Sequence, residues 1–189
     1  MGCVTLTVMR MNTSDEALAL AAAGGDRSAF ASLLDRHYDR LFRLCFRLTG
    51  RRDAAEDLTQ DICAALPAKL NGFRGTARFT TWLFRVAVNA AHDARRRAAT
   101  HARAADGWGT WEVNRQAAAR ESAEAQDWLH QAMRALPDDL RDTLALILDD
   151  ELTQAEAARV LDLSEGTVAW RMSDIRRRLR AMNEEETAG

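Results

Sequence analysis

The sequence predicts an all-α fold of two small helical domains joined by a linker, and three observations support this prediction. The 189 residues suit one large domain or two small ones, and 47% of them are hydrophobic, which is enough to build real cores. Only 2 prolines and 10 glycines interrupt the chain, which argues against disorder and against a fold rich in β-turns. Apolar residues recur at helical spacing between start and stop signals.

The first two helices have clear predicted ends. Ser14 can cap a helix that runs to about Ala23, and the glycine pair at 24–25 ends it. Asp26 begins a longer helix, and Gly50 stands where a left-handed residue would end it. The apolar stripe of this longer helix comprises Phe30, Leu33, Leu34, His37, Leu41, Leu44, Cys45 and Leu48.

Two more helices are expected in this first block. Asp53 and Glu56 have the spacing of a capping pair, and they open a third helix. This helix should bend or end near Pro67, because the proline ring removes a backbone hydrogen bond. A loop at 71–75 follows, and a fourth helix is expected over roughly 80–97.

A linker is expected between about 98 and 125, where the helical periodicity weakens. Its tryptophans, Trp108 and Trp111, either pack a local apolar corner or dock onto a partner. The second block opens with a helix that ends before Leu136, because the residue preceding a proline disfavours the helical conformation. Pro137 suits the first position of the next helix.

Residues 153–180 predict two helices joined by a tight turn. Thr153 and Glu156 have capping-box spacing, and Asp162 lies at the bend, where a left-handed backbone is often needed. Ser164 can cap the second helix, whose buried stripe is expected at Val168, Met172, Ile175 and Leu179. In a helix-turn-helix the second helix lies in the major groove of DNA. A solvated helical hairpin within a bundle is the alternative interpretation.

Charge is distributed unevenly along the chain. The formal net charge is -2, but residues 1–98 carry fifteen basic and ten acidic groups, a net of +5, which leaves a net of -7 for 99–189. Local patches govern partners more than the sum does. Lys69 is the only lysine, so almost every basic residue is an arginine. Arginine suits bidentate contacts to phosphate and guanine, although a GC-rich genome would give the same preference for arginine over lysine.

The cysteines and the chain start constrain the compartment. Cys3, Cys45 and Cys63 are odd in number and far apart, so no disulfide framework or zinc site is expected, and the last two should be buried thiols. Nothing approaches the roughly 18 to 20 apolar residues needed to span a membrane, and no signal peptide is visible. We therefore expect a soluble, cytoplasmic protein, for which Met9 and Met11 are alternative starts.

An enzyme is not expected. The sequence has no Ser/His/Asp set, no glycine-rich phosphate loop and no metal-ligand spacing, and its histidines are scattered. We therefore expect no catalytic residue, no metal and no cofactor.

Two polar surfaces are expected in the first block. Asp57, Gln60, Asp61 and Ala64 fall on one face of the third helix, although an ordinary solvated face would look the same. Rings and cations alternate in a second set: Phe73, Arg74, Arg78, Phe79, Thr80, Trp82, Phe84 and Arg85. This mixture suits unpaired bases, because stacking on a ring contributes about 1 to 3 kcal/mol per base and arginines follow the phosphates. For Phe84 and Trp82, a place in the core is the alternative.

Together these motifs resemble the extracytoplasmic-function sigma factors of bacteria. Residues 53–97 resemble the second conserved region of that family, and 137–182 resemble the fourth, in the same order and spacing. The strongest matches are DLTQDI at 57–62, FRGTARFTTWLFRVAVN at 73–89 and LSEGTV at 163–168.

The resemblance implies a domain organisation and a function. It implies sigma region 2 at 14–98, a linker at 99–125 and sigma region 4 at 126–183. It also implies a subunit that binds core RNA polymerase and promoter DNA, directs transcription initiation, and is restrained by an anti-sigma factor. A stand-alone helix-turn-helix transcriptional regulator, with a signal-sensing N-terminal half, is the alternative.

The resemblance also implies which residues contact polymerase and the minus-ten promoter element. The polymerase-docking residues are Asp57, Gln60 and Asp61. The minus-ten residues are Phe73, Arg74, Arg78, Trp82, Asn89, His92, Asp93, Arg95 and Arg96. Among them, Asn89 and Asp93 line a pocket for an extruded base, and His92 with the arginines at 95–97 contacts phosphate.

For the minus-thirty-five element the resemblance implies Ser164, Thr167, Ala169, Trp170, Arg171, Ser173, Asp174 and Arg177. Ala169, Trp170 and Asp174 depart from the common family pattern, so a standard minus-thirty-five sequence is in doubt. Arg171 is expected on the DNA backbone and Asp174 on a cytosine amine. Trp170 can contact a thymine methyl or a sugar, or pack against its own domain.

Overall fold

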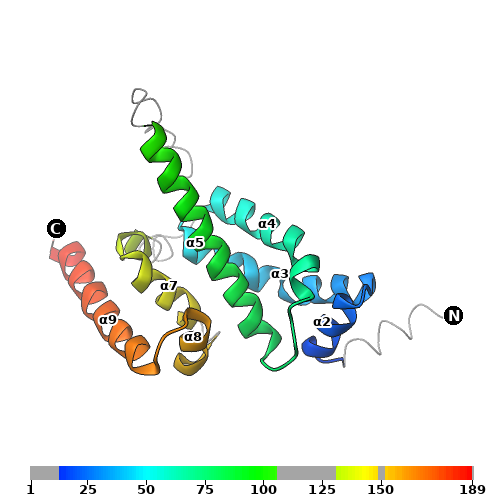
Figure 1. The fold of residues 1–189 in the computed structure, drawn as a ribbon. Coiled ribbons are helices and arrows are strands. Elements are labelled where there is room, and N and C mark those ends of the chain that lie inside the picture. The colour runs from blue at the N-terminus through cyan, green and yellow to red at the C-terminus, as the bar shows by residue number, and fades with distance from the viewer. Residues whose placement is uncertain (1–12, 106–130, 149–151, 189) are drawn as a thin grey trace.

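The architecture is all-helical in the part of the chain that the computed structural model describes, residues 13–105, 131–148 and 152–188. The helices, in chain order, are α2 (Asp15–Ala23), α3 (Arg27–Thr49), α4 (Arg52–Leu70), α5 (Phe79–Ala105), α7 (Asp138–Ile147), α8 (Gln154–Leu161) and α9 (Glu165–Ala188). Residues 131–135 are also helical. Figure 1 shows α2 to α5 as an N-terminal block, with α7 to α9 forming a C-terminal block beside α5. The predicted fold class is confirmed.

Local capping interactions set the ends of the first helices. Ser14 Oγ accepts a hydrogen bond from the backbone N–H of Ala17 (3.2 Å), so it caps α2. The Asp26 carboxylate accepts from two backbone N–H groups at the start of α3. Gly50 ends α3 with φ at 67°. This left-handed backbone conformation is strained for any residue that carries a Cβ atom, but not for glycine.

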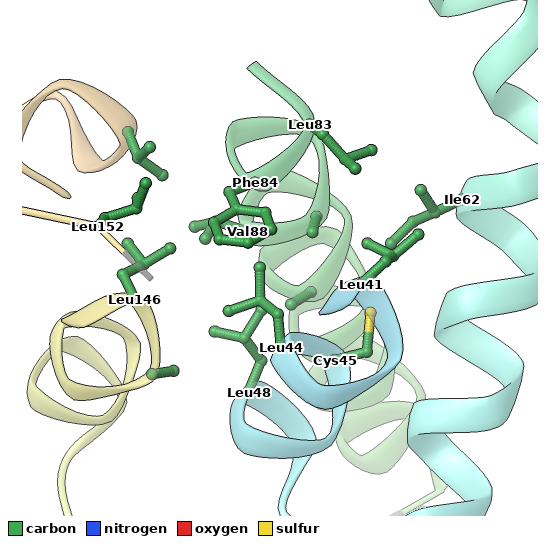
Figure 2. Close-up of a cluster of buried hydrophobic side chains, with 14 of the residues drawn as sticks. Leu41, Leu44, Cys45, Leu48, Ile62, Leu83, Phe84, Val88, Leu146 and Leu152 are labelled. Carbon is green, nitrogen blue, oxygen red and sulfur yellow. The ribbon is translucent and has the colours of Figure 1, made fainter. Parts of the chain in front are cut away.

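The core of the N-terminal block follows the predicted stripe of α3. Leu33, Leu41, Leu44 and Leu48 are each about 1% exposed, and they pack with buried residues of α4 and α5. Figure 2 shows part of this cluster, including Ile62 of α4. Cys45 is fully buried there, and burial raises its pKa to about 11; Cys63 is partly buried. None of the described helices is long and apolar enough to cross a membrane.

Two helix ends in this block differ from the sequence prediction. Asp53 and Glu56 do not form a capping box, because their carboxylates bind Arg51 and Arg52 instead. The helix α4 does not end at Pro67 but continues to Leu70. A proline costs one backbone hydrogen bond there, and the buried side chains of the last turn hold the helix on the core.

Helix α5 is longer than predicted, since it extends through Ala105 and takes in the first residues of the expected linker. The boundaries expected at 14–98, 99–125 and 126–183 stay predictions. Trp108, Trp111 and the alternative starts Met9 and Met11 lie outside the described residues.

The C-terminal block contains the predicted helix-turn-helix. The Thr153 hydroxyl and the Glu156 carboxylate form a complete capping box at the start of α8. Asp162 is left-handed, with φ at 58°, and makes the turn into α9. Val168, Met172 and Ile175 of α9 are buried and pack against α7 and α8. Pro137 caps α7 rather than occupying its first position, a shift of one residue.

The two blocks are in contact. Helix α3 packs against α7, and α5 packs against α8, so one apolar cluster runs through both blocks. Figure 2 shows Phe84 and Val88 of α5 facing Leu146 and Leu152 of the C-terminal block. The sequence did not predict this closed arrangement.

Candidate nucleic-acid and partner interfaces

The outward face of α4 carries the first predicted surface. Asp57, Gln60 and Asp61 are exposed, whereas Leu58 and Ile62 turn into the core. Neither aspartate forms an ion pair with any residue that the structure describes, in contrast to Glu56 of α4, which binds Arg52, and Glu156 of α8, which binds Arg78. The helix therefore presents two solvated negative charges to a partner.

The aromatic residues near the start of α5 lie mainly in the core. The Phe73 ring is only 6% exposed, and it meets Phe79 and Trp82 edge-on, with ring centroids 5.8 Å and 5.4 Å apart. The His37 ring also meets Phe79 edge-on, with ring centroids 5.1 Å apart. Burial of the rings against one another explains this placement. Phe73 is therefore not available for base stacking in this conformation, and its role at the minus-ten element stays a prediction.

The other rings of this segment lie in or against the core, whereas its arginines face the solvent. Phe84 is buried and Trp82 is partly buried, as the core alternative predicted, whereas Arg74, Arg78 and Arg85 are exposed.

A carboxylate of α2 fixes the start of α5. The backbone N–H of Phe79, the first residue of α5, donates to Glu16 Oε1 (2.9 Å). This hydrogen bond is the main reason that the pKa of Glu16 lies below its ordinary value. No local pattern in the sequence points to this role of Glu16, because its partner is 63 residues away.

The middle of α5 presents Asn89 and Asp93 one turn apart, and both are exposed. Asp93 is paired with Arg96 (2.9 Å), while no hydrogen bond to Asn89 is found among the described residues. The amide of Asn89 is thus the group on this face that is open to a base edge.

Other basic residues of the predicted minus-ten face contact the C-terminal block. Arg95 makes a two-pronged ion pair with Asp142 (3.0 and 2.7 Å), and His92 Nε2 lies 2.7 Å from Asp142 Oδ2. Arg78 Nη1 lies 3.1 Å from Glu156 Oε1. In the closed arrangement these cations already have anionic partners.

The outward face of α9 is centred on Trp170, whose indole is 64% exposed. It therefore does not pack against its own domain. Ala169, Ser173 and Arg177 are exposed beside it. Ser164 Oγ accepts from the backbone N–H of Thr167 (3.1 Å) and bonds its hydroxyl, so these two residues cap α9 as the sequence predicted.

Two residues of α9 are placed differently from the prediction. Arg171 folds onto α7, where it contacts the backbone oxygen of Asp139 (3.2 Å) and the hydroxyl of Thr143 (3.3 Å); its side chain is only 16% exposed. Asp174 is covered by Arg177 and Arg178, and its side chain is 8% exposed. The hydrogen bond from Arg178 is the main cause that holds the pKa of Asp174 below its ordinary value. As placed here, Arg171 does not extend towards a DNA backbone and Asp174 is not open to a base, so the roles expected of both residues stay predictions.

Both halves of the chain match known families. The sequence model of Sigma-70 region 2 matches residues 33–101, and that of Sigma-70 region 4 matches 126–179. The ECF RNA polymerase sigma factor SigM of Mycobacterium tuberculosis is 35% identical over 171 residues, which cover 90% of this chain and 85% of that protein. The chain belongs to the extracytoplasmic-function sigma factors. SigW of Bacillus subtilis, another member, is 29% identical over 82% of this chain and 89% of its own length.

Solved structures resemble this sigma factor along most of its length. A structure of CnrH in complex with the cytosolic domain of CnrY has a TM-score of 0.70, with 25% identity, and covers 92% of this chain and 99% of CnrH. The sigma factor RpoE from Bartonella quintana, in complex with the anti-sigma factor NepR, has a TM-score of 0.68, with 26% identity, over 82% of this chain and 96% of RpoE.

In this sigma factor, sequence reasoning missed the residues that join the blocks. No sequence motif pointed to Asp142 or Arg47 as a contact between the blocks, and Glu156 was predicted only to cap a helix. Their partners lie 47 to 98 residues away along the chain, so no local pattern reports them. The one available signal was the opposite net charge of the two halves.

Proposed function

We propose that this sigma factor binds core RNA polymerase through α4, engages the minus-ten element with α5 and reads the minus-thirty-five element with α9. The observation that carries this proposal is the presence of both sigma-70 regions in one chain, in family order. A stand-alone regulator would have a sensing N-terminal half, whereas here that half matches region 2. Such a factor directs transcription initiation and is not itself an enzyme.

Polymerase docking is supported by the exposed charges of α4. Asp57 and Asp61 lie on the face opposite Leu58 and Ile62, and each carboxylate is solvated. Complementary charge steers a partner with a basic surface to this face and fixes its orientation.

Minus-ten recognition is supported by the polar face of α5. We assign Asn89 to the edge of an extruded base, because an amide both donates and accepts hydrogen bonds and this one is exposed. Exposed arginines of α5 and of the loop before it, Arg74, Arg85 and Arg96 among them, can follow the phosphates. Phe73 would have to leave its contacts with Phe79 and Trp82 before a base could stack on it.

An anti-sigma factor is the second partner that we propose. Both structural relatives were solved as complexes, RpoE with the anti-sigma factor NepR and CnrH with the cytosolic domain of CnrY. We also place the protein in the cytoplasm, because promoter binding requires access to the chromosome. The proposed function needs no metal or cofactor.

The docking assignment is tested by Asp61→Arg, with Glu184→Arg as the matched control. Glu184 is exposed near the far end of α9, so its reversal changes net charge equally but leaves α4 intact. We expect Asp61→Arg to lose core polymerase in a pull-down, because the new cation repels a basic partner surface. The variant should keep the helical circular-dichroism spectrum and the melting temperature of the parent. Equal retention of polymerase by the parent and Asp61→Arg would show that α4 does not dock through this face.

A further inference from the structure

We propose that the C-terminal block inhibits the N-terminal block by imitating DNA. Carboxylates of α7 and α8 bind the basic face of α5, and Arg78 just before it, in place of promoter phosphates. This inference rests on the proposed role of α5 in minus-ten binding. The surface is formed by Asp138, Asp142 and Glu156, and is called here the acidic face. While it is engaged, Arg78, His92 and Arg95 are held by carboxylates and cannot contact minus-ten phosphates.

Asp142 is the centre of the acidic face. Its side chain is 4% exposed, and its two oxygens accept from both terminal nitrogens of Arg95 and lie beside His92 Nε2. A two-pronged contact of this kind is the geometry in which arginine binds a phosphate. Asp138 adds a second carboxylate, 3.6 Å from Arg95 Nε. The groups that would meet DNA phosphates thus meet protein anions of similar shape and charge.

Glu156 makes a second contact near the start of α5. One of its oxygens, Oε2, completes the capping box with Thr153, and the other, Oε1, faces Arg78. Arg78 is 71% exposed, so this ion pair contributes little energy and serves to align the blocks.

The charge asymmetry of the sequence has a physical explanation in this arrangement. A DNA-binding half with a net charge of -7 repels the phosphate backbone, whereas the same charge attracts the +5 half of its own chain. In the acidic face, carboxylates of the negative half contact cations of the positive half.

Apolar contacts and one buried arginine hold the blocks together. Phe84 and Val88 face Leu146 and Leu152, and all four side chains are nearly inaccessible to water (Figure 2). The Arg47 guanidinium donates to the backbone oxygens of Ala145 (2.9 Å) and Leu148 (3.3 Å), at the negative end of α7.

The closed arrangement is also built to be reversible. Arg141 lies at the same contact with its Nε buried and without a partner among the described residues, and burial, followed by the nearby charge of Arg95, lowers its pKa. Buried ion pairs add little net stability, because the charges regain water when they separate, but they do fix one orientation. Polymerase and promoter can therefore open an interface in which the ion pairs add little to the free energy of separation and the buried apolar contacts account for most of it.

The test compares full-length Asp142→Ala with Asp139→Ala, which removes the same charge from the same helix but faces Arg171 instead of α5. Small-angle X-ray scattering measures the radius of gyration of the free chain. Fluorescence anisotropy measures its affinity for a labelled, mixed-sequence single-stranded DNA of about 16 nucleotides, without polymerase.

We expect Asp142→Ala to increase the radius of gyration and to bind this DNA at least about tenfold more tightly, as an open population of about one chain in ten or fewer rises towards all. Asp139→Ala should match the parent in both measurements. Asp142→Asn keeps the shape of the side chain and removes only its charge, so it should shift both measurements in the same direction even if the alanine variant folds poorly.

An unchanged radius of gyration and unchanged DNA affinity in both Asp142 variants would overturn the inference while leaving polymerase docking, tested through Asp61, untouched. A larger radius of gyration without a gain in DNA affinity would refute the claim that the acidic face imitates DNA. Adding Asn89→Ala to the open chain then tests the α5 assignment itself, since loss of this amide should lower DNA affinity only if α5 binds DNA.

Discussion

Trp170 is the residue on α9 that best fits base reading, because the neighbouring candidates are already engaged. Asp174 is enclosed by Arg177 and Arg178, and Arg171 lies on α7. The Trp170 indole, in contrast, is 64% exposed on the outward face. An apolar side chain in the major groove distinguishes thymine by its methyl group.

We therefore expect Trp170→Ser to change the preferred minus-thirty-five sequence at one or two base pairs, with discrimination falling by about 1 to 3 kcal/mol there. Asp174→Asn is the control, because its carboxylate already binds its own helix. Selection from a randomised promoter library, with the variant holoenzyme, measures both. The same consensus for parent and Trp170→Ser would exclude this tryptophan from base reading.

At the scale of single helices, the sequence predicted those features that depend on neighbouring residues. Ser14, Asp26 and the Thr153–Glu156 pair cap their helices, and Gly50 and Asp162 are left-handed, as expected. Each of these interactions spans at most five residues, so the local pattern contains the information. The prediction that Val168, Met172 and Ile175 face inward is confirmed for the same reason.

What a side chain binds was harder to predict than whether it faces inward or outward. Asp53 does not cap α4, because Arg51, two residues before it, binds its carboxylate. The Phe73 ring is enclosed by Phe79 and Trp82, and its role at DNA stays a prediction. Arg171 reaches an α7 backbone oxygen 32 residues away. A helical wheel separates inward from outward positions, but it does not show what a long side chain at the boundary will bind.

Helix α8 should make stability depend on pH through Glu156. The backbone N–H of Thr153 is the main cause that lowers the pKa of Glu156 below its ordinary 4.5; its hydroxyl and Arg78 act in the same direction. A carboxyl whose pKa is depressed in the folded state stabilises the protein above its unfolded pKa, and this stabilisation is lost as pH falls through the folded value.

Glu156→Gln should therefore be less stable than the parent by about 1 kcal/mol near pH 7, and this difference should shrink between about pH 5 and pH 3. Urea unfolding at a series of pH values measures it. Glu165→Gln, which neutralises an exposed residue in the first turn of α9, should follow the parent curve more closely. A difference that is constant with pH would mean that the Glu156 charge does not stabilise α8.

At the scale of the whole molecule, the closed arrangement was beyond the reach of the sequence. The two blocks could be separated by their patterns and by the weak periodicity between them, but Arg47 and Ala145, which are 98 positions apart, give no sign of contact. Because the apolar cluster is continuous across both blocks, neither block can lose its fold without exposing surface of the other.

This continuity predicts that the free chain unfolds as one unit. Differential scanning calorimetry of the parent should show a single transition. Leu152→Ala should split it, because Leu152 faces α5 across the contact (Figure 2), and its truncation removes about 2 to 5 kcal/mol of packing from the coupling between blocks. The C-terminal block should then melt first, since it has the smaller core.

Leu18→Ala is the matched control, since Leu18 is equally buried but belongs to α2, which packs within the N-terminal block. It should lower the melting temperature by about 2 to 4 °C per kcal/mol lost and keep one transition. Two transitions in the parent would show that the blocks unfold independently, and a single transition in Leu152→Ala would show that the coupling does not depend on this contact. Either result would mean that the cluster joining α5 to the C-terminal block does not make them one cooperative unit.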